Sequence, residues 1–466
     1  MKKFAILALA ALLVVAFTVP AAALENEFGG YWRTRFYQMG HFNGEKTSSD
    51  VLGEQGNYRL VDTRTRLYYT AKINDNLKLV NKFEFDATWG ANGWSRAAAA
   101  AGNKGYGTPG ADGANIEIKN SYADFNTGPV NWTVGVQPYV LFRSFYIDND
   151  DAGLIGRWKV LDNFVLAGSW LKAYDGGSGD GNNSDVDSYT LTGAFWFSEN
   201  ISIKPSISWA HSSQVDLTYG GGVLAPDPAV AGTYNNLPVL GSTLPFGQLD
   251  LYTYGFDFDA DFDNFGIWAT AFGQTGSIDA TGQDLDVSAW LAAIGGNVML
   301  GPVELHAQGF YSPGDDDTDQ PDPLLRDDKL ENVQAPQGSY YWAEIMGYGM
   351  FDWAVPTGSP GDKIFNIWAA NIGATFKPMD KLSVTADLWY AERENDVLYV
   401  DPLSPTGFRT ESTLGTELDV KVTYQLVEGL NLDLVGAYLW AGDAISVDGN
   451  NQEDPYEFGA QLSLSF

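Results

Sequence analysis

Four arginines lie at spacings that would place their guanidinium groups on one wall. Arg33 and Arg35 are two residues apart, and so are Arg64 and Arg66. Side chains two positions apart on a β-strand project from the same face, so each pair would share a face. On two neighbouring strands of a hairpin, the four cations would form a ladder that steers solutes. The alternative is a structural ladder that is paired with neighbouring acids, namely Asp62, Glu84 and Asp86.

Two acidic runs have the alternating spacing of calcium ligands. In the first run, Gln320 stands where a calcium loop needs a glycine for its sharp turn. We therefore interpret both runs as solvated acidic loops, and we predict no metal and no cofactor. The runs consist of Asp315, Asp317 and Asp319, and of Asp448, Asn450, Gln452 and Asp454.

Catalytic chemistry has little support in the sequence. The chain has three histidines, His41, His211 and His306, and no cysteine. We find no nucleophile motif and no pair of histidines at zinc spacing. His306 shares a strand face with Glu304, which predicts a polar, lumenal environment for it. We predict that the protein is not an enzyme.

The composition excludes two broad classes of protein. The chain has 466 residues, with 59 acidic and 27 basic side chains and a formal net charge of −32. Such a charge argues against a nucleic-acid partner, because phosphate binding needs clustered Lys and Arg. Aromatic residues make up 14% of the chain, which excludes a disordered, low-complexity protein.

The N-terminus has the pattern of an export signal. Two lysines precede an apolar stretch, 4–19, and three alanines at 21–23 provide small residues for a signal peptidase. We therefore predict a cleavable signal peptide at 1–23 and a mature domain at 24–466. The alternative, an N-terminal membrane anchor, would need about 20 apolar residues.

Along the mature chain, apolar residues recur at every second position, which is the period of a β-strand. Eight short turns alternate with nine long polar connections, and with the two terminal strands this predicts 18 antiparallel strands. Short turns on one side and long loops on the other are typical of an up-and-down transmembrane β-barrel. In one example, Tyr252, Tyr254, Phe256 and Phe258 share a face, and Asp257, Asp259 and Asp261 share the other.

A soluble β-sandwich would show the same alternation, so other features must distinguish the two folds. Aromatic residues end several strands near the long loops, as expected for the belts at a lipid–water boundary. A closed barrel also leaves no unpaired edge. An arginine facing lipid would cost about 2–4 kcal/mol, so the arginine ladder must face the lumen. The belt residues are Trp89, Trp209, Tyr311, Tyr390 and Trp440.

The last strand, 456–466, alternates apolar residues on one face and ends at a phenylalanine. It resembles the C-terminal signal of Gram-negative outer-membrane barrels, which implies recognition by the barrel-assembly machinery. The alternative is an ordinary amphipathic last strand. The residues that carry the resemblance are Tyr456, Phe458, Ala460, Leu462, Leu464 and Phe466.

The whole mature chain resembles porins, particularly the Arg-rich 18-stranded group that includes alginate-export and substrate-selective porins. The resemblance is carried by the segments 62–67, 135–137 and 415–419. It implies an outer-membrane protein that is surrounded by lipid and lipopolysaccharide, either monomeric or homotrimeric. The implied function is passive diffusion of small hydrophilic solutes and ions. The alternative is an adhesin or structural barrel that acts through its long loops.

Segment 138–151 is unusually apolar for a solvated loop and ends in acidic residues. It resembles the porin loop that folds into the barrel and narrows it. Asp148, Asp150 and Asp151 would then face the arginine ladder and create a transverse field. The alternative is a loop packed on the rim. The aromatic segments 340–342 and 348–353 of another long connection would form either a plug or a binding surface.

Two features make opposite predictions about ion selectivity. The net charge favours cations, whereas the arginine ladder favours anions at a constriction, where charges are screened less than on the exposed rim. The lumenal acids outnumber the ladder arginines. We therefore expect weak cation selectivity, with a local wall that attracts anions.

Overall fold

The computed structural model describes ten stretches of the chain. The signal segment 1–23 and most of the two acidic runs lie outside these stretches. No helix in them is long and apolar enough to cross a bilayer. The described residues are 24–44, 56–90, 116–175, 185–213, 248–280, 283–315, 328–336, 340–400, 408–446 and 453–466.

β-Strands account for most of the described chain, as the two-residue period predicted. Many of them are longer than ten residues, which is enough to cross the apolar part of a membrane at a tilt. The strands are β1 (Glu25–Gly40), β2 (Tyr58–Asn74), β3 (Leu77–Thr88), β4 (Glu117–Thr127), β5 (Val130–Leu141), β6 (Ile147–Leu161), β7 (Phe164–Tyr174), β8 (Val186–Trp196), β9 (Ile201–Ser212), β10 (Leu249–Asp261), β11 (Phe265–Ala280), β12 (Gln283–Leu300), β13 (Val303–Ser312), β14 (Lys329–Leu330), β15 (Ile367–Met379), β16 (Leu382–Val400), β17 (Phe408–Val427), β18 (Leu430–Ala441) and β19 (Tyr456–Ser465).

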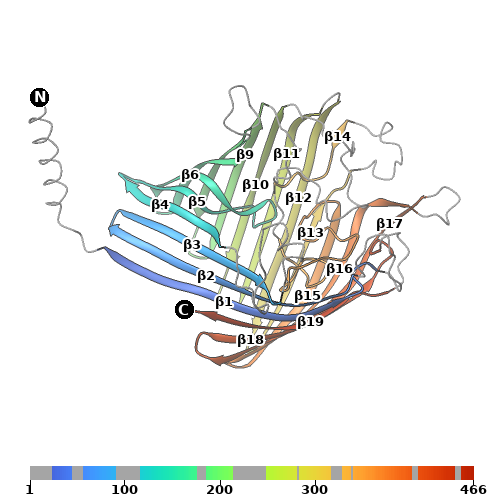
Figure 1. Ribbon diagram of the computed structural model, residues 1–466. Coiled ribbons are helices and arrows are strands. Elements are labelled where there is room, and N and C mark those ends of the chain that lie inside the picture. Colours follow the sequence, from blue (N-terminus) through green and yellow to red (C-terminus); the bar gives the residue numbers. More distant parts are fainter. Residues whose placement is uncertain are drawn as a thin grey trace, which may run out of the picture.

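The strands form one closed antiparallel barrel (Figure 1). Each strand pairs with its neighbours in the chain, and β1 pairs with β19 to close the sheet. The two-residue strand β14 is the exception: it runs parallel to β12, while β13 pairs directly with β15. Without β14, the described residues form 18 barrel strands, so the predicted fold is confirmed. The β-sandwich alternative is wrong, because there is one closed sheet rather than two packed sheets.

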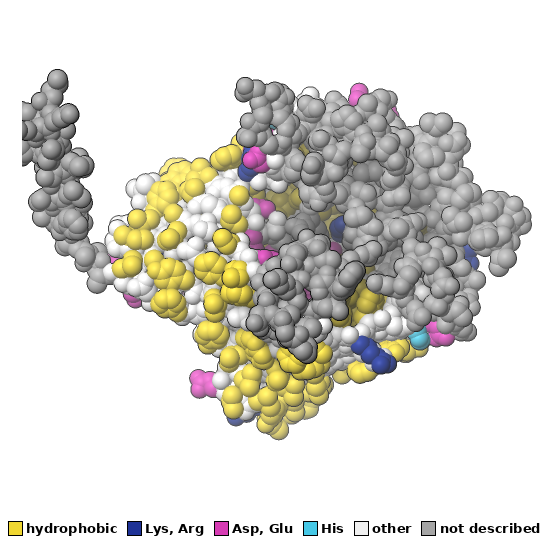
Figure 2. All heavy atoms as spheres, in the orientation of Figure 1, with side chains coloured by type: hydrophobic (Ala, Val, Ile, Leu, Met, Phe, Trp, Pro, Cys, Tyr) yellow, Lys and Arg dark blue, Asp and Glu magenta, His cyan; other side chains and the backbone are white. Residues whose placement is uncertain are grey.

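The outer face of the barrel is apolar (Figure 2). Large side chains such as Leu191, Ile207 and Ile294 are about half exposed there. Near the long-loop ends of β8, β9 and β10, the rings of Tyr189, Trp209 and Tyr252 stack in a row. Further aromatic pairs on the outer face continue the belt, for example Trp290 with Tyr311, Trp368 with Tyr390, and Tyr438 with Trp440.

Two chain segments occupy the inside of the barrel. We call residues 142–146, the turn between β5 and β6, the hairpin tip, and residues 340–366, which precede β15, the insert. Side chains of both segments belong to one buried apolar cluster together with inward-facing residues of the wall. This cluster is the core of the protein, and it fills part of what would otherwise be an open lumen.

Candidate channel constriction

The arginine ladder lies on the inner face of β1 and β2. Arg33 is directly opposite Arg64 in the strand register, and Arg35 is opposite Asp62. Arg35 makes a two-pronged ion pair with Asp62, with Nε–Oδ1 at 2.9 Å and Nη2–Oδ2 at 2.6 Å. A planar guanidinium matches a carboxylate well in this arrangement, so the charge of Arg35 is largely compensated.

The two arginines of β2 are neutralised from the other side, by β3. Asp86 is opposite Arg64, and Glu84 is opposite Arg66. Arg64 donates from Nε to Asp86 at 2.7 Å and lies 3.3 Å from Glu84, which also pairs with Arg66. The contacts therefore match the alternative interpretation of the ladder, in which the neighbouring acids pair with the arginines.

Arg33 differs from the other ladder arginines. Its nearest acid is Asp352 of the insert, at 3.6 Å, which is long for an ion pair. Its Nε atom is buried and has no hydrogen-bond partner within the described residues. Arg33 thus keeps more of its capacity to interact with a solute than Arg35, Arg64 or Arg66.

The hairpin tip folds into the barrel, which confirms the inward-folded segment. Phe142 stacks on Phe272 of β11, with ring centroids 5.0 Å apart. Arg143 pairs with Asp259 of β10, and its guanidinium lies 4.7 Å from the ring centre of Trp268. The tip is tight because three successive residues, 142–144, adopt positive φ. It is also shorter than predicted, because strands β5 and β6 extend through most of 138–151.

The three acids that follow the tip contact residues of β4 and of their own segment. Asp150 forms an ion pair with Lys119 of β4 at 2.7 Å. Asp148 accepts a hydrogen bond from Ser144 at 2.9 Å, and Asp151 accepts one from Asn149 at 3.0 Å. These acids belong to β6, so strand pairing holds them near β4 and β5. The expected opposition to the arginines comes instead from an acid of the insert, Asp352.

The insert enters the lumen because it carries a dense group of apolar side chains. Ile345, Met346 and Phe351 are completely buried. Phe351 stacks on Tyr37 of β1, with ring centroids 4.8 Å apart. At Gly459 of β19, an added Cβ would lie 2.5 Å from the Phe351 ring, so this close approach requires a glycine. The plug interpretation of the aromatic segments is therefore the one that the contacts support.

Polar contacts fix the insert to the wall on two sides. On β1, Arg35 donates to the carbonyl oxygen of Met350 at 2.8 Å and pairs with Asp352. On β17, Glu417 accepts from the backbone N–H of Ile345 at 2.6 Å and of Met346 at 2.9 Å. The insert also meets the hairpin tip, where Tyr340 stacks on Phe145 at 3.7 Å. Both segments also pack on Phe310 of β13, so together they narrow the lumen.

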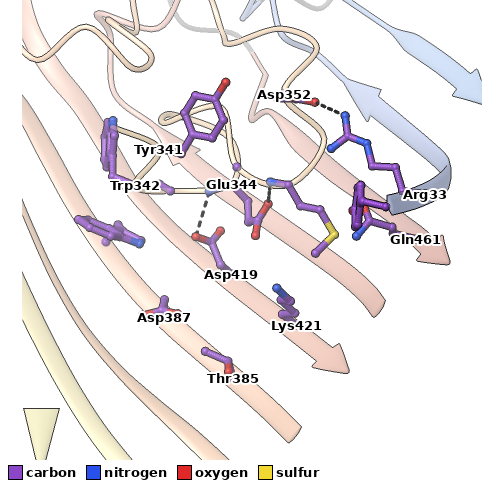
Figure 3. Close-up of a pocket in the computed structure, with 15 residues that line it drawn as sticks. Arg33, Tyr341, Trp342, Glu344, Asp352, Thr385, Asp387, Asp419, Lys421 and Gln461 are labelled. Atoms are coloured by element: carbon purple, nitrogen blue, oxygen red, sulfur yellow. Dashed lines mark hydrogen bonds and ion pairs between the residues drawn. The ribbon is translucent and has the colours of Figure 1, made fainter. Parts of the chain in front are cut away.

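A cavity of about 400 Å³ remains between the insert and the wall (Figure 3). Arg33 and Lys421 supply positive charge, and aromatic rings from both the insert and the wall line its sides. Lys421 forms no ion pair within the described residues. The cavity thus combines cations, acids and aromatic surfaces, which suits a small polar solute. The acids and rings that line it are Glu344, Asp352, Asp387, Asp419, Tyr31, Tyr341, Trp342 and Trp389.

His306 faces the lumen, as its strand face predicted. Its Nε2 atom lies 2.7 Å from Asp387, two strands away on β16. The intervening residue on β15 is Gly373, where a Cβ would lie 2.3 Å from the His306 nitrogen. The glycine therefore leaves the space that this contact needs.

The seam between β1 and β19 contains the predicted assembly signal. Phe458 and Phe466 are exposed, at 53% and 64%. The backbone of Phe466 exchanges two hydrogen bonds with Gly30, at 2.8 and 3.2 Å, and so ends the closing strand. Tyr456, Leu462 and Leu464, which are also part of the predicted signal, lie on the same alternating face of β19 as Phe458.

Several residues that prove central were not identified from the sequence. Asp352 and Glu344 gave no signal on their own, because their partners are distant in the sequence. The apolar character of 138–151 indicated the hairpin tip but not the role of Arg143. Glu417 and Asp419 were part of a resemblance to porins, without any predicted contact to the insert.

No family model and no curated protein matches the sequence. Among solved structures, the chain is similar to the outer membrane protein OpdK from Pseudomonas aeruginosa, with a TM-score of 0.53, 8% identity, and coverage of 95% of this chain and 98% of that chain. It is also similar to OccAB3 of Acinetobacter baumannii, with a TM-score of 0.54, 8% identity, and coverage of 95% and 99%. A structure of OpdK with vanillate matches with a TM-score of 0.53, 9% identity, and coverage of 94% and 98%. At these identities the likeness shows the fold, and the predicted resemblance to 18-stranded substrate-selective porins is confirmed at that level.

Proposed function

We propose that this chain is an outer-membrane porin through which small hydrophilic solutes and ions diffuse passively. The observation that carries the proposal is a closed barrel with an apolar outer face and a charged inner face that is narrowed by two segments. A barrel of this size is wide enough for an aqueous channel unless loops fill it. The cavity beside the insert supports a path that remains partly open. The proposal includes no cofactor and no chemical step, and it describes a channel rather than an enzyme.

The proposed path passes the constriction between the insert and the arginine ladder on β1 and β2. Arg33 and Lys421 would meet anionic groups of a solute, and the aromatic rings of the cavity would contact its apolar parts. The surrounding acids keep the lumen negative overall. We therefore propose weak cation selectivity, with a local anion-attracting wall at Arg33.

The proposed location follows from the same features. The signal peptide 1–23 would direct the chain through the general secretory pathway, and the barrel-assembly machinery would read β19. The mature barrel would then lie in outer-membrane lipid next to lipopolysaccharide. Sizing of the detergent-extracted protein distinguishes a monomer from a homotrimer.

Planar-bilayer recording tests the proposed function. A porin gives steady, ohmic conductance steps, whereas a barrel with a filled lumen that acts as an adhesin gives almost none. The same protein after heat denaturation serves as the control, because an unfolded barrel forms no steps. The adhesin alternative has no support from the structural neighbours. Absence of steps from correctly folded protein would contradict the porin proposal.

Vanillate, the compound present with OpdK, is a suitable first organic probe. It combines an aromatic ring with a carboxylate, and the cavity presents both aromatic surfaces and Arg33. If the path is as proposed, vanillate reduces the ionic current, and the Arg33→Ala variant responds more weakly. An equal response of both proteins would place the solute path elsewhere.

A further inference from the structure

Four carboxyl groups meet where the insert rests on the wall formed by β17 to β19. Glu417 and Asp419 project inward from β17, and Glu457 projects inward from β19. In the strand register, Asp419 and Glu457 are both opposite Ala437 of β18, whose small side chain separates them. The fourth group is Glu344 of the insert. We call these four residues the acid cluster.

The cluster is buried, and its carboxyl groups differ in the number of hydrogen bonds that they accept. Glu417 is 0% exposed and accepts two backbone N–H groups from the insert. Asp419 accepts the N–H of Glu344 at 3.2 Å. Glu457 is 2% exposed, and neither of its carboxyl oxygens has a hydrogen-bond partner within the described residues.

This bonding pattern favours one negative charge in the cluster. The N–H groups of residues 344–346 are consecutive and point at two wall carboxyls, an arrangement that stabilises an anion. A buried carboxylate without partners is very costly, so such a group remains neutral instead. Like charges at close range also cannot all be ionised. The geometry therefore suits an ionised Glu417 beside a protonated Glu457.

The surrounding charges do not change this conclusion. Arg35 is the cation that acts on Glu457, but it is already bound to Asp62 and Asp352. Lys421 acts on Glu344 from β17, whereas Asp387 on β16 adds a further negative charge. Arg33 faces Asp352 rather than the cluster. Burial raises the pKa of the Glu344 carboxyl, which agrees with a cluster poor in compensating charge.

We propose that the acid cluster is a proton-controlled latch that holds the insert against the wall. While Glu457 carries a proton, the insert stays bound through its N–H groups to Glu417. When Glu457 loses that proton at alkaline pH, it repels the ionised Glu417, and the insert loosens. The latch rests on the proposed channel function, because the insert it controls narrows the proposed path.

Cysteine labelling tests the latch without relying on conduction. The chain contains no cysteine, so a single introduced thiol reports on one site. Ala343 in the insert is 2% exposed, and Ala343→Cys would be protected while the insert is bound. The exposed residue Ser198, as Ser198→Cys, corrects for the intrinsic pH dependence of thiol reactivity. A water-soluble maleimide is the probe.

We expect the corrected labelling rate of Ala343→Cys to rise roughly tenfold between about pH 6 and about pH 9, where buried carboxyl groups lose their protons. Adding Glu457→Gln, which is always neutral, removes the rise. Asp433→Asn is the matched control, because Asp433 is also a buried lumenal carboxyl but accepts hydrogen bonds from Thr423 and Gln461. With Asp433→Asn, the rise remains.

Two results would overturn the latch: no rise in the parent protein, or an equal rise with Glu457→Gln. If Glu457→Gln does not fold, Glu457→Leu gives the same test, because it also cannot ionise. Bilayer recording of the same preparations separates the two proposals. Conduction without a change in labelling contradicts the latch alone. A change in labelling without any conduction contradicts the channel alone.

Discussion

Two inner walls of the same barrel hold charge in opposite ways. On β1 to β3, each of Arg35, Arg64 and Arg66 meets an acid on a neighbouring strand. On β17 and β19, the carboxyl groups that face the insert are buried: Glu417 accepts backbone N–H groups of the insert, and Glu457 has no hydrogen-bond partner within the described residues. Both walls carry charged residues at the same two-residue period. The comparison shows that the role of a lumenal charged residue depends on what lies next to it. Where a neighbouring strand supplies an opposite charge, the residue forms an ion pair, and where the insert covers it, the residue binds backbone N–H groups or stays without a partner.

The largest expected effect is at Glu417 of β17, which holds the insert by accepting two of its backbone N–H groups. Glu417→Ala would leave the N–H groups of Ile345 and Met346 without their acceptor, at about 1–3 kcal/mol each while they stay buried. Release of the insert avoids this cost, so we expect a clearly larger single-channel conductance. Thr416→Ala, at the adjacent position on β17, is the control. An unchanged conductance would show that apolar packing alone holds the insert.

Arg35 provides the matching test on the arginine wall. Arg35→Ala leaves Asp62 and Asp352 without their main cation, which we expect to destabilise the barrel by about 2–3 kcal/mol. Glu457→Gln on β19 should leave the free energy of unfolding unchanged at neutral pH, because it replaces a protonated, neutral carboxyl group by a neutral amide. The temperature at which the folded band disappears on a semi-native gel measures both. Equal destabilisation by both changes would remove the distinction between the walls.

At Arg64 and Arg66 we expect a smaller effect on stability and a measurable effect on ion selectivity. Replacing both by Ala leaves Glu84 and Asp86 uncompensated in the lumen. The channel should become more cation-selective, measured as a shift of the reversal potential in a salt gradient. The Arg64–Asp86 pair is partly exposed, with side chains that are 21% and 42% exposed, so we expect the loss of this pair to cost about 1 kcal/mol or less. A reversal potential that does not move would show that the ladder is purely structural.

The smallest effect is expected at Lys421, the cation beside the acid wall. Lys421→Met removes a charge that forms no ion pair in the described part of the chain, so stability should change by no more than about 0.5 kcal/mol. The reversal potential should shift in the same direction as for the arginine variants, but less. A larger shift than theirs would place the narrowest point of the path at Lys421 rather than at the ladder.

Much of the fold was predictable from local pattern. Alternation along β10 is enough to separate Tyr252 and Tyr254 from Asp257 and Asp259, because side chains on a strand alternate strictly between faces. The same rule placed Arg33 and Arg64 in the lumen. The alternation of short and long connections predicted the number of barrel strands, since it reflects the two sides of a membrane.

The partners of the charged residues could be predicted only partly. Asp62, Glu84 and Asp86 were identified as partners of the arginines because they lie on adjacent strands. Asp148, Asp150 and Asp151 were predicted to lie on a loop facing the arginines, but they belong to β6, and the sequence does not reveal where that strand begins. Of the three, Asp150 lies beside Lys119 of β4 and forms an ion pair with it.

The sequence by itself determined the barrel, its apolar outer face and the inward direction of its charges, because these follow from a two-residue period and from turn lengths. Only the tertiary structure decided how the lumen is filled. The insert reaches Arg35 and Glu417 across separations of hundreds and tens of residues, and contacts over such separations depend on where a long connection folds back. The position of the insert depends on the combined packing of Phe351, Met346 and Trp342 against several strands of the barrel. No local sequence pattern encodes this packing.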